Sequence, residues 1–489
     1  MSEIPRNTQE LQHVWRDVCR TPPPKRPASE RITDFGETYA TYDAAAAQEQ
    51  ARRCIQCPEA LCMVGCPLAN RIPEWLLLTA EGRFLEAAAL SRSTSNMPEI
   101  CSRVCPQDRL CEGACILNSR TEPVAIGAIE RFLNEYAFAH GAVDATPAPP
   151  NGFRVAVVGA GPAGLSCADE LARRGYAVTL FEAQALAGGL LVYGIPGFKL
   201  EKSVVARRVE VLLRRGVTLQ TGVVLGRDIS LAGLEAEFDA VFLGLGAQQP
   251  RPLGIPGADL AGVHFALPFL IQKNAPSPAE PPIIDVAGRR VIVLGGGDTA
   301  MDCLRTAIRG GAAEAVCLYR RDRANMPGSR KEFDNSVEEG ARFEFLTAPT
   351  ELRGDGAGRV AGVRCLRMRL GASDAGGRRR PVPVEGSEFE VAADVVLVAY
   401  GFMPVPFPRG SDLGRIACDA EGRVKVDDHW RTNLPGVFAA GDLSRGADLV
   451  VTAVRDARRA AVEIHRYLVF GQSGDLGLGW TDHVSPEPG

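Results

Sequence analysis

The sequence predicts an α/β protein in which a helical N-terminal domain precedes two nucleotide-binding units. Three observations predict it. Eight of the 14 cysteines lie between Cys54 and Cys115, among residues with helical spacing. From Phe153 onward, short runs of Val, Leu and Ile alternate with helical patterns, as in parallel sheets covered by helices on both faces. Two runs, VAVVG at Val155 and VIVLG at Val291, each end in a glycine cluster and indicate one unit present twice.

Composition excludes several classes of protein. The 489 residues allow about three domains, and 46% hydrophobic with 23% charged residues excludes a disordered or collagenous chain. A balance of 55 Lys+Arg against 59 Asp+Glu, net charge -4, excludes a strongly basic nucleic-acid-binding protein. The N-terminus has no pattern typical of a signal peptide, and no stretch gives 18 uncharged apolar residues without glycine-rich turns. We therefore expect a cytoplasmic protein with no nucleic acid and no membrane contact.

The domain boundaries follow from changes in composition. A Pro/Ala/Gly stretch at 141–152 is too poor in large apolar residues for a regular element, so the helical domain is placed at 1–140. The segment 273–282 reads as a linker between the two glycine clusters. We expect the second unit to be inserted in the first, with a first part at 153–282, the insert at 283–400, a second part at 401–470 and a polar tail at 471–489.

The cysteines form two groups with tight internal spacing. The order is Cys54-x2-Cys57-x4-Cys62-x3-Cys66-Pro and then Cys101-x3-Cys105-Pro-x4-Cys111-x3-Cys115. This spacing is related to iron–sulfur frameworks, although bacterial ferredoxins have x2 where this chain has x4. Two all-cysteine zinc sites are the alternative, since no histidine lies between Cys54 and Cys115 to make a mixed site. In a reducing compartment, disulfides are the least favoured reading.

The first glycine cluster predicts a dinucleotide site. Gly159, Gly161 and Gly164 stand between a buried strand and a helix, and Glu182 ends the next strand. The glycines allow the backbone to approach a pyrophosphate at the helix N-terminus, and the acid is placed to bind a ribose hydroxyl.

The second cluster predicts a different nucleotide. Arg320, followed by Arg321, stands where the first unit has Glu182. A guanidinium there binds a 2′-phosphate and favours NADPH over NADH, although a solvated strand end is the simpler alternative. The residues assigned to NADPH in this unit are Gly295, Gly296, Gly297, Asp298, Thr299, Ala300, Arg320 and Arg321.

The two kinds of site require a third cofactor. NADPH gives up a hydride, whereas an iron–sulfur cluster accepts one electron at a time, so a flavin must stand between them. The first unit is then an FAD site. The chain is thus predicted to be an oxidoreductase that uses NADPH, FAD and two 4Fe-4S clusters.

Read together, these residues resemble the small (beta) subunits of NADPH-dependent glutamate synthase over about 26–468. The stretches that carry the resemblance include RCIQCPEALCMVGCPLANRIPEWL, PEICSRVCPQDRLCEGAC, GGLLVYGIPGFKLEKSVVARR and CLYRRDRANMPGSR. The same module is similar to the N-terminal half of dihydropyrimidine dehydrogenase and to large subunits of NADH-dependent ferredoxin:NADP oxidoreductase.

The resemblance implies a set of ligands that the spacing leaves open. One 4Fe-4S cluster would be held by Cys54, Cys57, Cys62 and Cys115. The other would be held by Cys66, Cys105 and Cys111 with Glu130 as a non-cysteine ligand, and Cys101 would not bind iron. The implied flavin contacts are Gly188, Gly189, Leu190, Gly194, Ile195, Pro196, Gly441 and Asp442.

The resemblance also implies a role and a partner. The chain would be an electron-input subunit that oxidises NADPH and passes electrons to a large (alpha) subunit. That subunit would carry FMN and make glutamate from glutamine and 2-oxoglutarate. Two alternatives stay open: a reductase with another acceptor, such as ferredoxin or a pyrimidine-reducing partner, and a zinc-stabilised nucleotide-binding sensor without turnover. At Tyr400 the sequence departs from the family, where a smaller aliphatic residue is usual.

Overall fold

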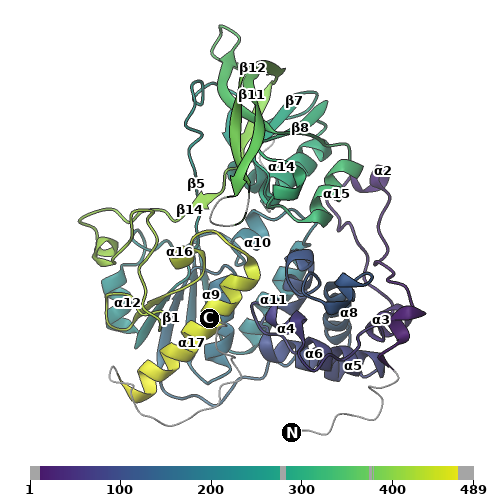
Figure 1. The fold of residues 1–489 in the computed structure, drawn as a ribbon. Helices are drawn as coiled ribbons and strands as arrows, with labels where there is room; N and C mark the ends of the chain where they lie inside the picture. Colours follow the sequence, from purple (N-terminus) through teal and green to yellow (C-terminus); the bar gives the residue numbers. More distant parts are fainter. Residues whose placement is uncertain (1–10, 276–281, 374–376, 378, 472–489) are drawn as a thin grey trace.

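The computed structural model describes residues 11–275, 282–373, 377 and 379–471. Helices form the N-terminal region, and α/β units follow it, as predicted (Figure 1). The helices of the first region are α2 (Ala28–Arg31), α3 (Ala44–Ala51), α4 (Leu61–Val64), α5 (Ile72–Ala80), α6 (Phe84–Thr94), α7 (Pro98–Val104) and α8 (Ile126–Ala139), with short 3₁₀ turns at Val14–Arg16, Gln107–Arg109 and Ile116–Ser119. Apart from residue 471, the tail predicted at 471–489 lies outside the described residues.

The segment from Pro73 to Arg92, whose apolar residues have helical spacing, contains two helices. Helix α5 ends at Ala80 and α6 begins at Phe84. Gly82 lies between them with φ of 77°, a left-handed conformation that glycine adopts without the steric cost of a Cβ. The break lets α5 and α6 pack against each other.

The first α/β unit is a five-stranded parallel sheet in the order β15-β4-β1-β2-β3. Its strands are β1 (Arg154–Val158), β2 (Ala177–Glu182), β3 (Thr218–Thr221), β4 (Ala240–Leu243) and β15 (Val437–Ala439). Its helices are α9 (Pro162–Ala172), α10 (Leu190–Tyr193), α11 (Lys202–Arg214), α12 (Leu231–Glu237), α16 (Asp442–Arg445) and α17 (Val450–Phe470). Strand β15 joins this sheet only after the whole second unit has intervened in the sequence. The second unit is therefore inserted in the first, which confirms the predicted fold class.

The inserted unit is a second parallel sheet in the order β6-β13-β7-β8-β9. Its strands are β6 (Val263–Phe265), β7 (Arg290–Leu294), β8 (Glu314–Tyr319), β9 (Arg342–Phe345) and β13 (Val395–Val398), and its helices are α13 (Ala266–Asn274), α14 (Asp298–Arg309) and α15 (Arg330–Glu338), with a 3₁₀ turn at Arg323–Asn325. A short ribbon of β5 (Gln249–Pro250) and β14 (Phe402–Met403) connects the two units. Another 3₁₀ turn, Asp412–Arg415, precedes β15.

An antiparallel arm extends from the inserted unit at the top of Figure 1. It consists of β10 (Thr347–Gly354), β11 (Val360–Ser373) and β12 (Arg379–Ala392). Its inner residues pack on the second sheet, where Leu352, Val363 and Cys365 join the core of Ile292 and Leu318.

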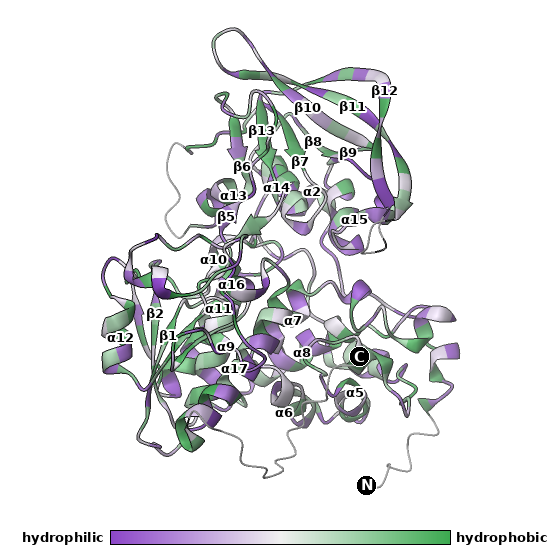
Figure 2. Ribbon diagram, turned by 60° about the vertical axis from the view of Figure 1, so that its left-hand side comes forward, coloured by the Kyte–Doolittle hydropathy of each residue, from purple (hydrophilic) through white to green (hydrophobic). Residues whose placement is uncertain are grey.

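The central strands of both sheets are buried and apolar, and Figure 2 shows them as the hydrophobic centres of the two units. The helical domain shares the core of the first unit, because Met97 and Ile100 of α7 pack in the same cluster as Val157 and Leu171. Within the described residues, no helix is long and apolar enough to cross a membrane.

Candidate functional site

A single large cleft of about 1530 Å³ is lined by the glycine loops of both units. Pockets for one drug-sized ligand occupy roughly 300–1,000 Å³, so this cleft has room for more than one such molecule. It lies where parallel strands of both sheets end, the usual ligand position in open α/β sheets.

The first glycine loop presents its backbone to the cleft. Gly159 and Gly161 line it, and α9 begins directly after Gly161 with no side chain capping its N-terminus. A Cβ on Gly161 would meet no atom within 4 Å, whereas one on Gly164 would lie 1.7 Å from the Gly159 carbonyl oxygen. Gly161 therefore leaves room for a ligand, and Gly164 permits the helix to pack closely on the strand.

Glu182 lies at the end of β2, on the wall of the same cleft. Its Oε2 accepts a hydrogen bond from the Ala160 N–H at 2.8 Å, and its Oε1 accepts one from the Gln184 N–H at 2.8 Å. These bonds fix the carboxylate beside the glycine loop, with lone pairs left for a ribose hydroxyl.

The segment 188–196 packs beside the first glycine loop. The Gly188 N–H donates to the Ala160 carbonyl at 2.8 Å, and Gly189, Leu190 and Ile195 line the cleft. Gly194 and Pro196 belong to the same turn but are not among the residues that line the cleft. Lys202 donates to the carbonyls of Leu191 and Ile195, and burial lowers its pKa to about 8.

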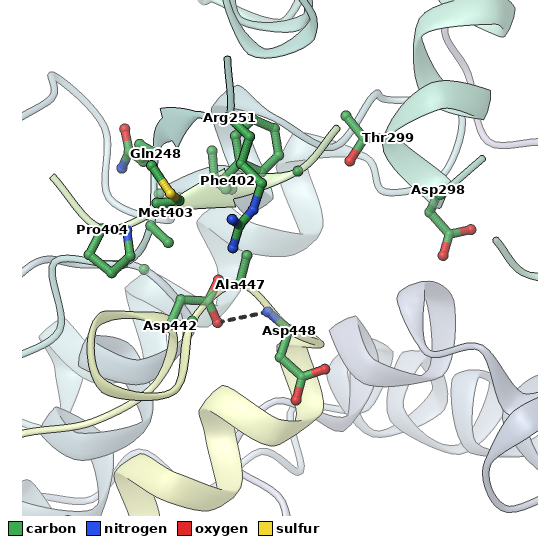
Figure 3. Close-up of a pocket in the computed structure, with 18 of the residues that line it drawn as sticks. Gln248, Arg251, Asp298, Thr299, Phe402, Met403, Pro404, Asp442, Ala447 and Asp448 are labelled. Carbon is green, nitrogen blue, oxygen red and sulfur yellow. Dashed lines mark hydrogen bonds between the residues drawn. The ribbon is translucent and has the colours of Figure 1, made fainter. Parts of the chain in front are cut away.

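Gly441 and Asp442 stand at the start of α16, and Asp442 is seen at the cleft in Figure 3. Asp442 lines the cleft, and its Oδ1 accepts from the Asp448 N–H at 3.4 Å. Burial raises the pKa of Asp442 to about 7. Gly441 has φ of 69° and supports the turn behind it, in contact with Ala163 at the start of α9.

The second glycine loop repeats the arrangement of the first. Gly295, Gly296, Gly297, Asp298 and Thr299 line the cleft, and α14 begins after Gly297 without a side-chain cap. A Cβ on Gly297 would again meet open space. Ala300 is fully buried behind the loop.

The two arginines after β8 differ in their surroundings. Arg320 is exposed and lines the cleft, and its guanidinium forms no ion pair or hydrogen bond with any residue that the structure describes. Arg321 is buried and also reaches the cleft, but its Nε donates to the Arg379 carbonyl of the arm at 2.8 Å. Arg320 is therefore the stronger candidate for an anionic ligand.

Sequence reasoning missed several charged residues that line the cleft, Arg251, Lys199 and Asp302 among them. Arg251 follows β5 and points toward Asp442 and Ala447 in Figure 3. Lys199 of the first unit pairs with Asp302 of α14 at 3.0 Å, and both side chains are buried. No motif marks these positions, because the pair forms only when the two units meet.

The first predicted cysteine group comes together in space. Burial, together with the neighbouring thiols Cys62, Cys115 and Cys57, raises the pKa of Cys54. Burial and the thiols Cys115 and Cys57 likewise raise the pKa of Cys62 to about 12. Cys115, which is distant in the sequence, thus lies near the thiols of Cys54, Cys57 and Cys62 in the helical domain.

The second group lines a small separate cavity. Cys66, Cys105, Cys111 and Glu130 all face it, and so does Cys101, which lies within hydrogen-bond distance of Cys105. The Glu130 Oε1 accepts from Asn70 Nδ2 at 2.8 Å and from Ser91 Oγ at 3.0 Å, and burial raises its pKa to about 7. The sequence position of Glu130 alone suggests an exposed acid on a helix surface. In the structure the carboxyl is buried and faces this cavity.

The cysteines are unpaired, with no disulfide in the described part of the chain. There, no three His, Cys, Asp or Glu side chains are close enough to hold one metal ion. A 4Fe-4S cluster has a different requirement, since each of its irons takes one protein ligand and the thiolates surround the cluster. The thiols of the two groups, with Glu130, are donors of the kind that such clusters take.

The cavity of the second group adjoins the large cleft. Val104, next to Cys105, lines the cleft. Val450 lines the cleft and its neighbour Val451 lines the small cavity. The second group therefore lies next to the wall of the cleft.

Comparisons with known families agree with this division of the chain. Residues 31–142 match the family described as dihydropyrimidine dehydrogenase domain II, 4Fe-4S cluster. Residues 153–457, more than half of the chain, match the pyridine nucleotide-disulphide oxidoreductases.

Curated relatives span nearly the whole chain. The glutamate synthase [NADPH] small chain of Azospirillum brasilense is 48% identical over 454 residues, which are 91% of this chain and 94% of the relative. A protein of Escherichia coli K12 named as the oxidoreductase AegA is 47% identical over 469 residues, 94% of this chain and 71% of the relative.

Among solved structures, the chain is similar to FprA of Mycobacterium tuberculosis in complex with NADPH. The TM-score is 0.57 at 22% identity, over 67% of this chain and 86% of that one. At this identity the likeness concerns the fold of the two α/β units.

Proposed function

Because the chain belongs to the pyridine nucleotide-disulphide oxidoreductases and, within them, to the glutamate synthase small chains, we propose that it is an electron-input subunit. It takes electrons from NADPH and delivers them to a separate large subunit that makes glutamate from glutamine and 2-oxoglutarate. Membership of this family confirms the resemblance noted in the sequence. The proposed location is the cytoplasm, where NADPH serves as a reductant.

The observation that carries the proposal is the single cleft shared by two open glycine loops. Each loop leads into an uncapped helix, and each helix N-terminus attracts the phosphates of one dinucleotide. The first loop with Glu182 suits FAD, and the second loop with Arg320 suits NADPH. Both cofactors would thus lie in one cavity, where the nicotinamide and the flavin can meet.

The protein side chains orient and shield the cofactors. Glu182 fixes a ribose through its spare lone pairs, and Arg320 neutralises a 2′-phosphate. The segment 188–196 closes one side of the cleft with Leu190 and Ile195 and excludes water from the flavin. When bound, FAD accepts a hydride and gives up its electrons singly, which is the chemistry that connects NADPH to 4Fe-4S clusters.

The two cysteine groups would hold the clusters that accept electrons from the cleft. Cys66, Cys105 and Cys111 with Glu130 would hold the cluster beside the cleft, because Val104 and Val450 of the cleft adjoin Cys105 and Val451 of the small cavity. Cys54, Cys57, Cys62 and Cys115 would hold the other cluster. The group in the small cavity would then be the one placed to receive electrons from the cleft.

The large subunit, with its FMN, completes the reaction in this proposal. The test is reconstitution of anaerobically purified chain with a separately purified large subunit, NADPH, glutamine and 2-oxoglutarate. We expect glutamate to form only when both proteins are present. NADPH-dependent reduction of the chain without glutamate formation in the mixture would exclude this partner.

A second candidate is supported by the relative AegA, which matches 94% of this chain at 47% identity. The same module could serve a reductase with another acceptor, such as ferredoxin or a pyrimidine-reducing partner. Rapid reduction of ferredoxin by NADPH through this chain, with no stimulation by the large subunit, would favour that candidate.

A further inference from the structure

Two side chains flank the second glycine loop at the same edge of the sheet. Tyr400 follows β13 and Arg320 follows β8, and β7 with its glycine loop lies between those two strands. Both residues line the cleft. Gly295 packs against Ala399, since a Cβ on Gly295 would lie 2.4 Å from the Ala399 carbonyl oxygen. Tyr400 therefore stands directly beside the loop assigned to the NADPH phosphates.

The arm supplies an apolar wall at the same place. Ala348 and Pro349 of β10 line the cleft, and β10 starts beside the end of β8 because the Leu346 N–H donates to the Arg321 carbonyl at 3.1 Å. Pro349 is opposite Cys365 of β11. Burial raises the pKa of Tyr400 to about 12, with Arg320 and Cys365 among the groups near enough to affect it. The tyrosine is thus near both the arginine and this wall.

Within the described chain, neither the Tyr400 hydroxyl nor the Arg320 guanidinium has a hydrogen-bond or ion-pair partner. The Tyr400 side chain remains 39% exposed, and no hydrogen bond to its hydroxyl occurs among the described residues. The Arg320 guanidinium likewise has no carboxylate partner there. A flat aromatic face beside an unneutralised guanidinium matches one ligand chemistry, a purine carried on a phosphorylated ribose.

We propose that the ring of Tyr400 stacks on the adenine of NADPH, so that Tyr400 and Arg320 together hold the adenosine 2′-phosphate half of the nucleotide. This inference rests on the proposed use of NADPH and adds a residue to it. Tyr400 contributes affinity for the base, and Arg320 contributes selection for the 2′-phosphate. The two contributions are separable, because NADH has the same adenine but lacks that phosphate.

Binding of adenosine 2′,5′-bisphosphate to the intact, cofactor-loaded chain tests the stacking without turnover. Isothermal titration should give a Kd about tenfold higher for Tyr400→Ala than for the natural protein, the usual size of a lost base–aromatic contact. Tyr400→Phe keeps the ring and should bind as the natural protein does. Phe470→Ala removes an exposed ring at the end of α17, far along the chain from the cleft, and should have no effect.

A nucleotide comparison separates the two residues. Tyr400→Ala should raise KM for NADPH and NADH by the same factor, whereas Arg320→Ala should raise it for NADPH alone. An unchanged Kd for the bisphosphate in Tyr400→Ala, or a Tyr400→Phe variant as weak as Tyr400→Ala, overturns the stacking role. If the natural protein binds the bisphosphate but NADPH does not reduce it, the proposed function fails while the adenosine site stands.

Discussion

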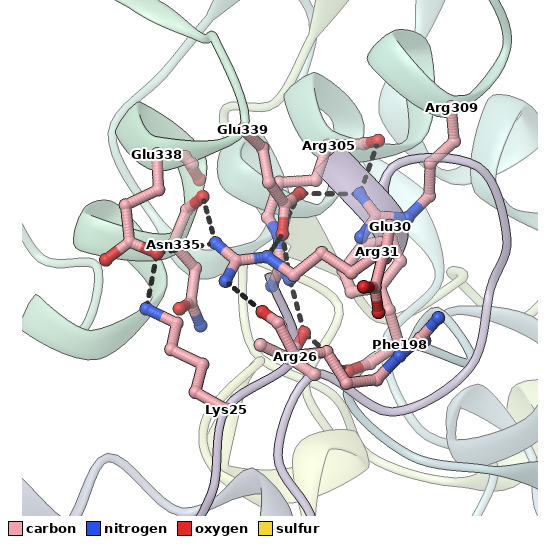
Figure 4. A network of polar contacts seen from close by, with 12 residues as sticks. Lys25, Arg26, Glu30, Arg31, Phe198, Arg305, Arg309, Asn335, Glu338 and Glu339 are labelled. Carbon is pink, nitrogen blue, oxygen red and sulfur yellow. Dashed lines mark hydrogen bonds and ion pairs between the residues drawn. The ribbon is translucent and has the colours of Figure 1, made fainter. Parts of the chain in front are cut away.

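Arg31 Nε donates to Glu339 Oε1 at 2.7 Å, in a buried ion pair between residues 308 positions apart (Figure 4). Arg31 lies in the N-terminal segment, and Glu339 ends the helix α15 of the inserted unit. The same carboxylate accepts from Arg305 and Arg309 of α14. The N-terminal segment is thereby fixed to the helix that starts at the second glycine loop. We infer that this network holds the inserted unit in position over the first.

Removal of Arg31 should destabilise the protein strongly. Arg31→Ala leaves the buried Glu339 and the exposed Glu338 without one partner, and loss of one member of a buried pair costs roughly 3–5 kcal/mol. Since Glu339 keeps Arg305 and Arg309, we expect a fall of about 3 kcal/mol in the free energy of unfolding, measured in urea. Arg71→Ala, which breaks the exposed pair with Glu74, should change it by less than about 1 kcal/mol. Equal effects would contradict the role of the network.

The same carboxylate predicts how stability depends on pH. Burial alone would raise the pKa of Glu339, but hydrogen bonds from Arg305 and Arg309 outweigh burial and lower the pKa to about 2, from an ordinary 4.5. A depressed pKa contributes stability that is complete above pH 4.5 and is lost as the pH falls toward 2. We expect Glu339→Gln to be less stable than the natural protein at pH 6, with the difference shrinking below pH 4.5. A difference that stays constant down to pH 3 would refute the assignment.

Arg320 should control the choice of nicotinamide cofactor. Arg320→Ala removes a guanidinium with no described protein partner, so the loss is confined to the ligand. A charged hydrogen bond to a phosphate predicts a roughly ten- to hundredfold rise in KM for NADPH and little change for NADH. Steady-state reduction of an artificial acceptor measures both. Arg369→Ala on the exposed arm is the matched control. A rise of the same size in KM for NADH would show that Arg320 does not bind the 2′-phosphate.

The two cysteine groups should lose iron independently. Cys62→Ala and Cys111→Ala should each lower the iron content by about four atoms per chain, because each belongs to a different group. Cys101→Ser should keep all the iron, whereas Glu130→Ala should alter the EPR spectrum of one cluster only. Loss of iron in Cys101→Ser with full retention in Glu130→Ala would reverse the assignment of the fourth ligand.

Local patterns were sufficient to predict the two α/β units and their glycine loops. A buried strand, a glycine turn and a helix lie within about 30 residues, so the sequence order is also the spatial order. Glu182 and Arg320 were found for the same reason, since each ends the strand that follows its loop. The helical character of the segment 73–92 in the N-terminal domain was also predicted, but the break between α5 and α6 was not, because Gly82 permits a left-handed turn that hydrophobic spacing does not reveal.

Long-range contacts were not predictable in this way. Arg31 and Glu339, or Lys199 and Asp302, have no spacing that marks them as partners, because they meet only when separate units dock. The position of Tyr400 beside Arg320 depends on strand order, β13-β7-β8, which places a late strand next to an early one. The arm formed by β10, β11 and β12 was also not predicted, although its residue Pro349 lines the cleft.

The central claim is that one chain carries electrons from NADPH through FAD to two iron–sulfur clusters. The most direct measurement is iron, sulfide and zinc analysis of anaerobically purified chain, with the flavin absorbance followed after NADPH or NADH is added to the same sample. We predict about eight iron atoms per chain, no stoichiometric zinc, and rapid bleaching of the flavin by NADPH but not by NADH. Zinc in place of iron, or no bleaching by NADPH, would contradict the account.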